Sequence, residues 1–309
     1  MKNILSVHIV IALLFVVSCQ RQERTDQGRT AACWIYAMCA CIEHESLLRG
    51  DSVALSRQWL MARELQEQTE ALFLARHGTS SLTMGTERGI TMRGVGPEAL
   101  RLIERYGLVP YHFEETMINN SRVMERKLSL LARQSQDITS LRKRMRELLP
   151  EFSIANPMPE EGWGGNSTSF FYYSVRYTPR QFAESVTYGL HYDWYASDNK
   201  QPWGTSFVLD ETDNYRHHRY VNAPLKDILK KVIAAVRQGH AVYWEYGKGH
   251  TSGHAMAIVG LRKGKDGEER LVCLNSYGSR WGEKGYCTVS LDYFMSTTCN
   301  VGIPHRTWK

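Results

Sequence analysis

Residues 27–34 read QGRTAACW, and a run that is apolar on nearly every side follows them up to Gly50. Such a run predicts a central buried helix with Cys33 in its first turn. The positive end of the helix dipole favours the thiolate form of a cysteine in that position. Gln27 lies six residues before Cys33, on the loop that leads into the helix. Its side-chain amide would join the Cys33 backbone N–H as an oxyanion hole, so we interpret Cys33 as a nucleophile.

Two later stretches supply a histidine and an asparagine. Residues 253–260 read GHAMAIVG, which predicts a strand that begins near His254, and residues 275–286 read NSYGSRWGEKGY. A turn signal at 263–267 predicts that the two stretches form an antiparallel hairpin. His254 and Asn275 would then stand roughly opposite each other. An asparagine oxygen in that position holds an imidazole in the tautomer that faces the thiol.

The rest of the chain divides into a helical first part and a strand-rich second part. Helical patterns occupy residues 55–75, 99–106, 119–149, 179–186 and 225–237. Short strand patterns occupy residues 241–246, 255–260, 271–275 and 286–291. A segment rich in Pro, Gly and acidic residues at 156–163 indicates a linker or a long surface loop. The order predicts an α+β protein, with one domain at residues 19–155 and a second at residues 156–309.

Together the three polar stretches resemble the papain family of cysteine peptidases, in the family's chain order. Shorter stretches at 106–110, 177–179 and 220–225, among others, resemble its bleomycin-hydrolase or aminopeptidase C branch. The resemblance implies a papain-like two-domain fold, with a helical left domain, a β-barrel-like right domain and the active cleft between them. It also implies four catalytic residues: the oxyanion donor Gln27, the nucleophile Cys33, the base His254 and its orienting partner Asn275.

The same resemblance implies how the substrate is held. Gly94 and Val95 correspond to the backbone strip that binds the extended substrate chain, although a simple turn before the next helix is an alternative interpretation. Tyr277 stands where the family usually has a Trp that shields the His–Asn hydrogen bond. A tyrosine still offers an aromatic face, so we expect weaker shielding and count Tyr277 among the residues near the substrate.

The resemblance leaves the mode of cleavage open. In the bleomycin-hydrolase branch a C-terminal arm enters the cleft and restricts cutting to free N-termini, but here only 34 residues follow Asn275. We therefore expect an open cleft, or one closed by the helical insertion at 119–149, and keep aminopeptidase and endopeptidase action as alternatives. The competing function is a catalytically idle papain fold that serves as a surface binding protein. Another Cys–His acyl transfer, such as cell-wall amide cleavage, is disfavoured by residues 275–286.

The N-terminal sequence predicts export. Lys2 precedes an uninterrupted apolar run at 9–17, which is too short for a stable membrane-spanning helix but typical of a signal-peptide core. The run is followed by Ser18 and Cys19, which resembles a loose bacterial lipobox. We expect removal of residues 1–18, a lipid on Cys19 and anchorage on the bacterial cell envelope. An ordinary secretory signal that is cleaved nearby is the alternative.

Charge and residue spacing disfavour several other functions. The formal net charge is +6 without a dense basic stripe, so we do not expect nucleic-acid binding. His217 and His218 have no Cys or carboxylate partner at a useful spacing, and we expect neither a metal site nor a cofactor. Five cysteines remain besides Cys19 and Cys33, an odd number, and we expect few or no disulfides. The expected partners are a peptide or protein substrate and the membrane, with oligomerisation left open.

Overall fold

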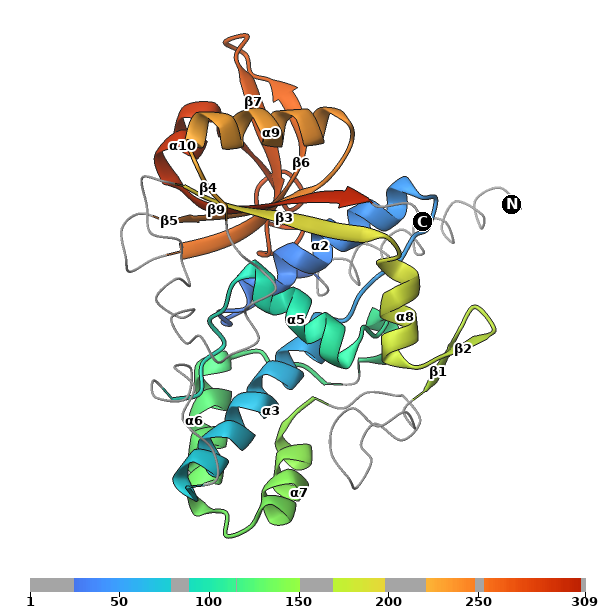
Figure 1. The fold of residues 1–309 in the computed structure, drawn as a ribbon, viewed down its shortest axis with the longest axis vertical. Coiled ribbons are helices and arrows are strands. Elements are labelled where there is room, and N and C mark those ends of the chain that lie inside the picture. The colour runs from blue at the N-terminus through green and yellow to red at the C-terminus, as the bar shows by residue number, and fades with distance from the viewer. Residues whose placement is uncertain are drawn as a thin grey trace, which may run out of the picture.

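Helices dominate the first part of the chain and a seven-stranded sheet dominates the second (Figure 1). The structure, a computed structural model, describes residues 25–78, 89–114, 116–150, 169–197, 221–247 and 253–306. Its helices are α2 (Cys33–Leu48), α3 (Arg57–Arg76), α5 (Gly96–Tyr106), η1 (Tyr111–Phe113), α6 (Ser121–Gln134), α7 (Ile138–Leu148), α8 (Pro179–Val186), α9 (Leu225–Arg237) and α10 (Leu291–Thr297). Its strands are β1 (Phe170–Tyr172), β2 (Val175–Tyr177), β3 (Leu190–Ser197), β4 (Val221–Ala223), β5 (Val242–Gly247), β6 (Gly253–Lys263), β7 (Glu269–Leu274), β8 (Tyr286–Ser290) and β9 (Thr298–Arg306).

Helix α2 is the central helix of the molecule, as the sequence predicted. Every residue from Trp34 to Ile42 is buried, so the helix has no solvent-facing side over this stretch. It packs against α3 and α5 on one side and against β5 and β6 on the other. A helix that is apolar all round needs such a position between two layers. Its first residue, Cys33, therefore lies where the helical part meets the sheet.

The helical insertion expected at 119–149 is two helices instead of one. Helix α6 ends at Gln134 and α7 begins at Ile138. The side chain of Asp137 accepts a hydrogen bond from the backbone N–H of Ser140 at 2.8 Å and caps the start of α7. An aspartate in this N-cap position favours a new helix start over continuation of the preceding one. The apolar periodicity predicted the helices but not the break between them.

The large sheet has the strand order β4-β3-β9-β5-β6-β7-β8, and all neighbouring pairs except β3 and β4 are antiparallel. Helices α9 and α10 pack on one face of the sheet, where their apolar side chains meet residues such as Trp244 and Val301. Helix α2 covers the other face through Tyr243, Ala255 and Ala257 (Figure 1). The predicted α+β fold class is confirmed.

Strands β3 and β9 were not predicted from the sequence, although they lie in the middle of the sheet. Strand β9 pairs with β3 on one side and β5 on the other. It contains Gly302 and Pro304, which weaken a strand signal because glycine lacks a side chain and proline lacks an N–H. The glycine is required by packing, since a Cβ at Gly302 would lie 2.7 Å from the ring of Trp194 on β3.

Several predicted features lie outside the described residues. These are the signal segment at 1–18, Cys19, the boundary between residues 155 and 156, and the pair His217 and His218. Within the described ranges, no helix combines the length and apolarity that a membrane span requires. The six cysteines of these ranges are free thiols, and two of them, Cys273 and Cys287, face each other across β7 and β8.

Candidate active site

Cys33 lines a cavity of about 280 Å³ between the start of α2 and residues of β5 and β6. The cavity is lined by six of the seven residues that the sequence singled out for catalysis and substrate binding within the described ranges: Gln27, Cys33, Gly94, Val95, His254 and Tyr277. The seventh, Asn275, is buried behind the histidine that it contacts. Three segments that are far apart in sequence therefore meet in one cleft.

The thiol of Cys33 lies at the start of α2, close to β6. The backbone N–H groups of Trp34 and of Ala255, the residue after His254, lie near enough to lower the pKa of the thiol. The next side chain, Trp34, is buried, and its indole N–H donates to the carbonyl of Met92 at 2.8 Å. This contact ties the beginning of α2 to the segment that leads to Gly94.

His254 is positioned on β6 by a polar partner and two aromatic rings. Its Nε2 lies 2.7 Å from Oδ1 of Asn275. The ring of Tyr277 stacks on the imidazole with centroids 5.0 Å apart, and Tyr246 meets it edge-on at 5.8 Å. Burial lowers the pKa of His254 below its ordinary value, while the hydrogen bond to Asn275 opposes this shift. This shift favours the neutral imidazole, the form that acts as a base.

The predicted hairpin is confirmed, but the two residues are not direct partners in it. In the ladder of β6 and β7, Leu274 pairs with Ala257, and the register shifts between Ile258 and Gly260. Asn275 follows the last residue of β7, and its side chain reaches diagonally to His254. The expected geometry placed the centre of the turn between residues 264 and 265, but Lys263 pairs with Glu269, so the turn is centred on Asp266.

Gln27 is buried on the loop before α2. Its side-chain oxygen accepts a hydrogen bond from the hydroxyl of Ser276 at 2.5 Å, and its Nε2 donates to the carbonyl of Thr30 at 2.6 Å. The Gln27 backbone N–H also donates to the carbonyl of Ser276 at 2.8 Å. Because the oxygen is occupied by a donor, the amide nitrogen is fixed on the side of the Thr30 loop, and one of its two hydrogens is left for a ligand in the cavity.

At Gly94 the chain passes close to the indole of Trp34. A Cβ on Gly94 would lie 2.6 Å from Cε2 of the indole, a distance that real Cβ atoms essentially never show. Val95 is extended and precedes the first residue of α5. Only glycine therefore fits over the indole, and Gly94 and Val95 both line the cavity.

Burial works against ionisation of the Cys33 thiol. The pKa of Cys33 is raised to about 11, with burial as the main cause; the carboxyl group of Glu245 adds to this rise, and the nearby backbone N–H groups oppose it. This direction is opposite to the partly ionised thiol expected from a helix start, because loss of water outweighs the helix dipole. Cys287 shows the opposite shift, because a hydrogen bond from Cys273 lowers the pKa of its thiol.

Three further residues in or behind the cleft were not predicted from the sequence. Glu245 and Tyr246 of β5 line the cavity, and Ser276 holds the side chain of Gln27 from behind. Glu245 lies directly opposite Ala255 in the ladder of β5 and β6. Glu245 lies on a predicted strand that comes just before the strand of His254 in the sequence. Its place in the cleft follows only once β5 is known to pair with β6.

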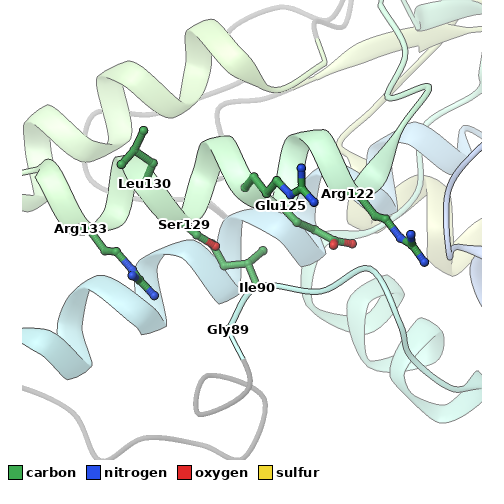
Figure 2. Close-up of a pocket in the computed structure, with 8 residues that line it drawn as sticks. Gly89, Ile90, Arg122, Glu125, Ser129, Leu130 and Arg133 are labelled. Carbon is green, nitrogen blue, oxygen red and sulfur yellow. The ribbon is translucent and has the colours of Figure 1, made fainter. Parts of the chain in front are cut away.

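The cleft continues into two more hollows along the helical part. One, of about 670 Å³, shares Arg93 with the cleft and is also lined by Arg29 and Arg122. The next, of about 660 Å³, lies between α6 and Ile90, and Figure 2 shows Arg122 and Arg133 along it. The surface beside Cys33 is therefore an open trough lined by arginines.

Comparison with known proteins shows which family a part of this chain resembles. Residues 193–305, which include His254 and Asn275, match the sequence model of the family described as papain family cysteine protease. A search of the curated proteins found no match. The fold is similar to that of PepW from Lactobacillus rhamnosis HN001, with a TM-score of 0.63, 18% identity, and coverage of 90% of this chain and 79% of that chain. The chain is also similar to xylellain, a cysteine protease from Xylella fastidiosa, with a TM-score of 0.47, 13% identity, and coverage of 92% and 82%.

Proposed function

We propose that this papain-like cysteine peptidase cleaves peptide bonds with Cys33 as the nucleophile and His254 as the general base. In this scheme Asn275 orients the imidazole, and Gln27 and the Cys33 backbone N–H bind the oxyanion. The observation that carries the proposal is that Cys33 and His254 line one cavity while His254 is held by Asn275 at 2.7 Å.

The proposed chemistry follows from which nitrogen is occupied. Since Nε2 of His254 contacts Asn275, Nδ1 is the nitrogen that takes the proton from the Cys33 thiol. The thiolate then attacks the substrate carbonyl carbon, and the developing negative oxygen accepts hydrogen bonds from the oxyanion donors. The imidazolium returns its proton to the departing amine. A water molecule, activated by the same imidazole, hydrolyses the thioester and regenerates the thiol.

We propose an open cleft, and therefore endopeptidase action, in preference to the aminopeptidase action that the bleomycin-hydrolase branch implies. Residues 298–306 are held in the centre of the sheet as β9, and the guanidinium of Arg306 donates to the carbonyl of Tyr188 at 2.8 Å. A segment held in this way is not an arm in the cleft. The arginine-lined hollows beside Arg93 also give a long peptide room beyond the cavity.

One set of assays tests the nucleophile and the mode of cleavage. Fluorogenic peptides with blocked and with free N-termini are incubated with the wild type and with Cys33→Ala. We expect the wild type to cleave blocked peptides internally and the variant to cleave neither. Cleavage of free-amine peptides alone would refute the open cleft, and full activity in Cys33→Ala would refute the nucleophile. A wild type that binds peptides without cleaving them would favour the idle binding protein.

Thiol labelling of Cys33 needs Cys287→Ser as a control. Iodoacetamide alone is ambiguous, since Cys287 has the lowered pKa and is only partly buried. A peptidyl epoxide requires the cleft, so it should modify Cys33 in the wild type and in Cys287→Ser alike. Peptide mapping by mass spectrometry identifies the modified residue. Epoxide on Cys287 in place of Cys33 would contradict the proposed site.

We further propose that the enzyme is anchored to the bacterial cell envelope through a lipid on Cys19. The proposal is supported by the apolar run at 9–17, which ends just before Ser18 and Cys19. Acyl chains supply a membrane affinity that a globular domain lacks. Radiolabelled palmitate should enter the wild type but not Cys19→Ala, and label in both forms would exclude this residue.

A further inference from the structure

Glu245 is a carboxyl group on the wall of the cleft that the proposed chemistry does not use, and burial raises its pKa to about 7. Glu245 is only 5% exposed to solvent, yet it lines the same cavity as Cys33 and His254. Strand β5 places it opposite Ala255, so it lies beside the residue that follows His254. The carboxyl group lies near enough to the Cys33 thiol to raise the pKa of that thiol.

The contacts of Glu245 are all with neutral donors. Its Oε1 accepts from the backbone N–H of Gly96 at 2.9 Å and from the hydroxyl of Tyr243 at 2.5 Å. Its Oε2 accepts from the side-chain amide of Asn300 at 2.6 Å. Within the described part of the chain, no Lys, Arg or His forms an ion pair with this carboxylate.

Other buried carboxylates of the molecule have cationic partners. Glu43 pairs with Arg57 at 2.5 Å, and Glu45 lies near His240 and Arg306. A buried carboxylate is costly unless it is paired or well hydrogen-bonded, and a charged partner gives the stronger bonds. Glu245 differs from these residues in its position at a cavity that is open to a ligand.

The surroundings of Glu245 define where a partner would come from. Gly96, which donates to Glu245, is the first residue of α5 and directly follows Gly94 and Val95. The backbone of those two residues is the proposed substrate strip, so a substrate residue bound there projects toward Glu245. Tyr246, next along β5, adds an aromatic wall to the same cavity, and such a wall suits the aliphatic part of a long cationic side chain.

We propose that Glu245 is a specificity-determining residue, whose carboxylate receives a cationic nitrogen of the substrate residue that lies along Gly94 and Val95. This inference rests on the proposed function of the cleft. The cation has two possible sources: the side chain of a Lys or Arg residue, or the free α-ammonium of a peptide whose N-terminus lies in the cavity. A Lys or Arg side chain is compatible with the open cleft, whereas an α-ammonium would make the enzyme an aminopeptidase.

The test compares cationic with neutral substrates in the wild type and in Glu245→Gln, which retains the size of the side chain. One series is N-terminally blocked and carries Arg, Lys, Leu or norleucine at each position on the acyl side of the cleaved bond. A second series has free N-termini and neutral side chains, with acetylated counterparts. The readout is the ratio of kcat/KM for the cationic and the matched neutral peptide.

We expect the wild type to prefer the cation in one series, and Glu245→Gln to lower that ratio about tenfold or more, the effect of one charge-assisted hydrogen bond. The series that responds identifies the source of the cation. Glu45→Gln is the matched control, since this buried carboxylate does not line the cavity, and its ratio should stay at the wild-type value. A wild-type ratio near one in both series, or an unchanged ratio in Glu245→Gln, would overturn the proposal.

A binding measurement separates this inference from the proposed catalysis. Calorimetry compares the binding of Arg-containing and Leu-containing peptides to Cys33→Ala and to the double variant that also carries Glu245→Gln. It measures the same preference for cations without turnover. Neutral peptides that are cleaved without any preference for cations would leave the proposed function standing and remove Glu245 from it. A protein that prefers cationic peptides in calorimetry but cleaves none would keep the role of Glu245 and refute the proposed catalysis.

Discussion

Replacement of Gly94 by Ala perturbs the cleft at its most crowded point. The new Cβ would lie 2.6, 2.7 and 3.0 Å from three atoms of the Trp34 indole, whereas ordinary contact begins near 3.4 Å. The two groups must therefore separate by about 0.8 Å. The indole is buried and bonded to the carbonyl of Met92, so the backbone of residues 93–95 is the part that moves. Overpacking of this kind costs about 1–3 kcal/mol.

If this cost falls on the substrate strip, kcat/KM drops by about 5- to 100-fold, since 1.4 kcal/mol corresponds to a factor of ten. The assay is kcat/KM with a blocked fluorogenic peptide, together with the alkylation rate of Cys33 read by peptide mapping. Iodoacetamide is small and does not need the strip, so this rate should change much less. Gly260→Ala is the control, because its Cβ would meet Val272 at an ordinary 3.7 Å. Wild-type kcat/KM in Gly94→Ala would refute the reasoning, and so would an equal loss of alkylation and turnover.

Three further changes test the groups around the thiol and the core. Asn275→Ala removes a neutral hydrogen bond worth about 1 kcal/mol, so kcat/KM should fall about fivefold. Because that bond raises the pKa of His254, its loss should also move the acidic limb of the pH profile to lower pH; an alkaline shift would contradict this. His254→Ala should slow Cys33 alkylation at pH 7 about 100-fold or more, since the thiol then lacks its base, and an unchanged rate would show an independent thiolate. Arg57→Met leaves the Glu43 carboxylate without its guanidinium and should lower the free energy of unfolding by about 3–5 kcal/mol in urea titrations; a loss below 1 kcal/mol would show that water relieves the charge.

Local sequence patterns were sufficient for much of the fold and for several residues of the cleft. An apolar run predicts a buried helix whatever it packs against, and α2 has this form from Trp34 to Ile42. The turn at 263–267 likewise predicts the pairing of β6 and β7 from neighbouring residues alone. Polar residues at the ends of such elements, Cys33 and His254 among them, could therefore be found before the structure was known.

Features that depend on distant pairings could not be predicted in this way. Strand β9 carries Gly302 and Pro304, and its role becomes clear only when Trp194 of β3 is seen to pack over the glycine. Glu245 is similar, because its chemistry depends on Gly96 and Asn300, which lie 149 and 55 residues away along the chain. In a window of sequence it is one glutamate in an apolar strand, and the cavity that it faces does not exist until the helices and the sheet meet.

The charge of the Glu245 carboxyl group affects the ionisation of the Cys33 thiol. With its pKa raised to about 11, the Cys33 thiol alone would be almost fully protonated at pH 7. The negative charge of Glu245 is one cause of that high pKa, next after burial among those that raise it. A substrate cation bound to Glu245, as proposed, would offset this charge and lower the pKa of the thiol as the peptide enters. Proton transfer to His254 would then become easier with a cationic substrate than in the empty cleft. In Glu245→Gln the charge is absent from the start, so Cys33 alkylation in the free enzyme should reach its half-maximal rate at a lower pH than in the wild type.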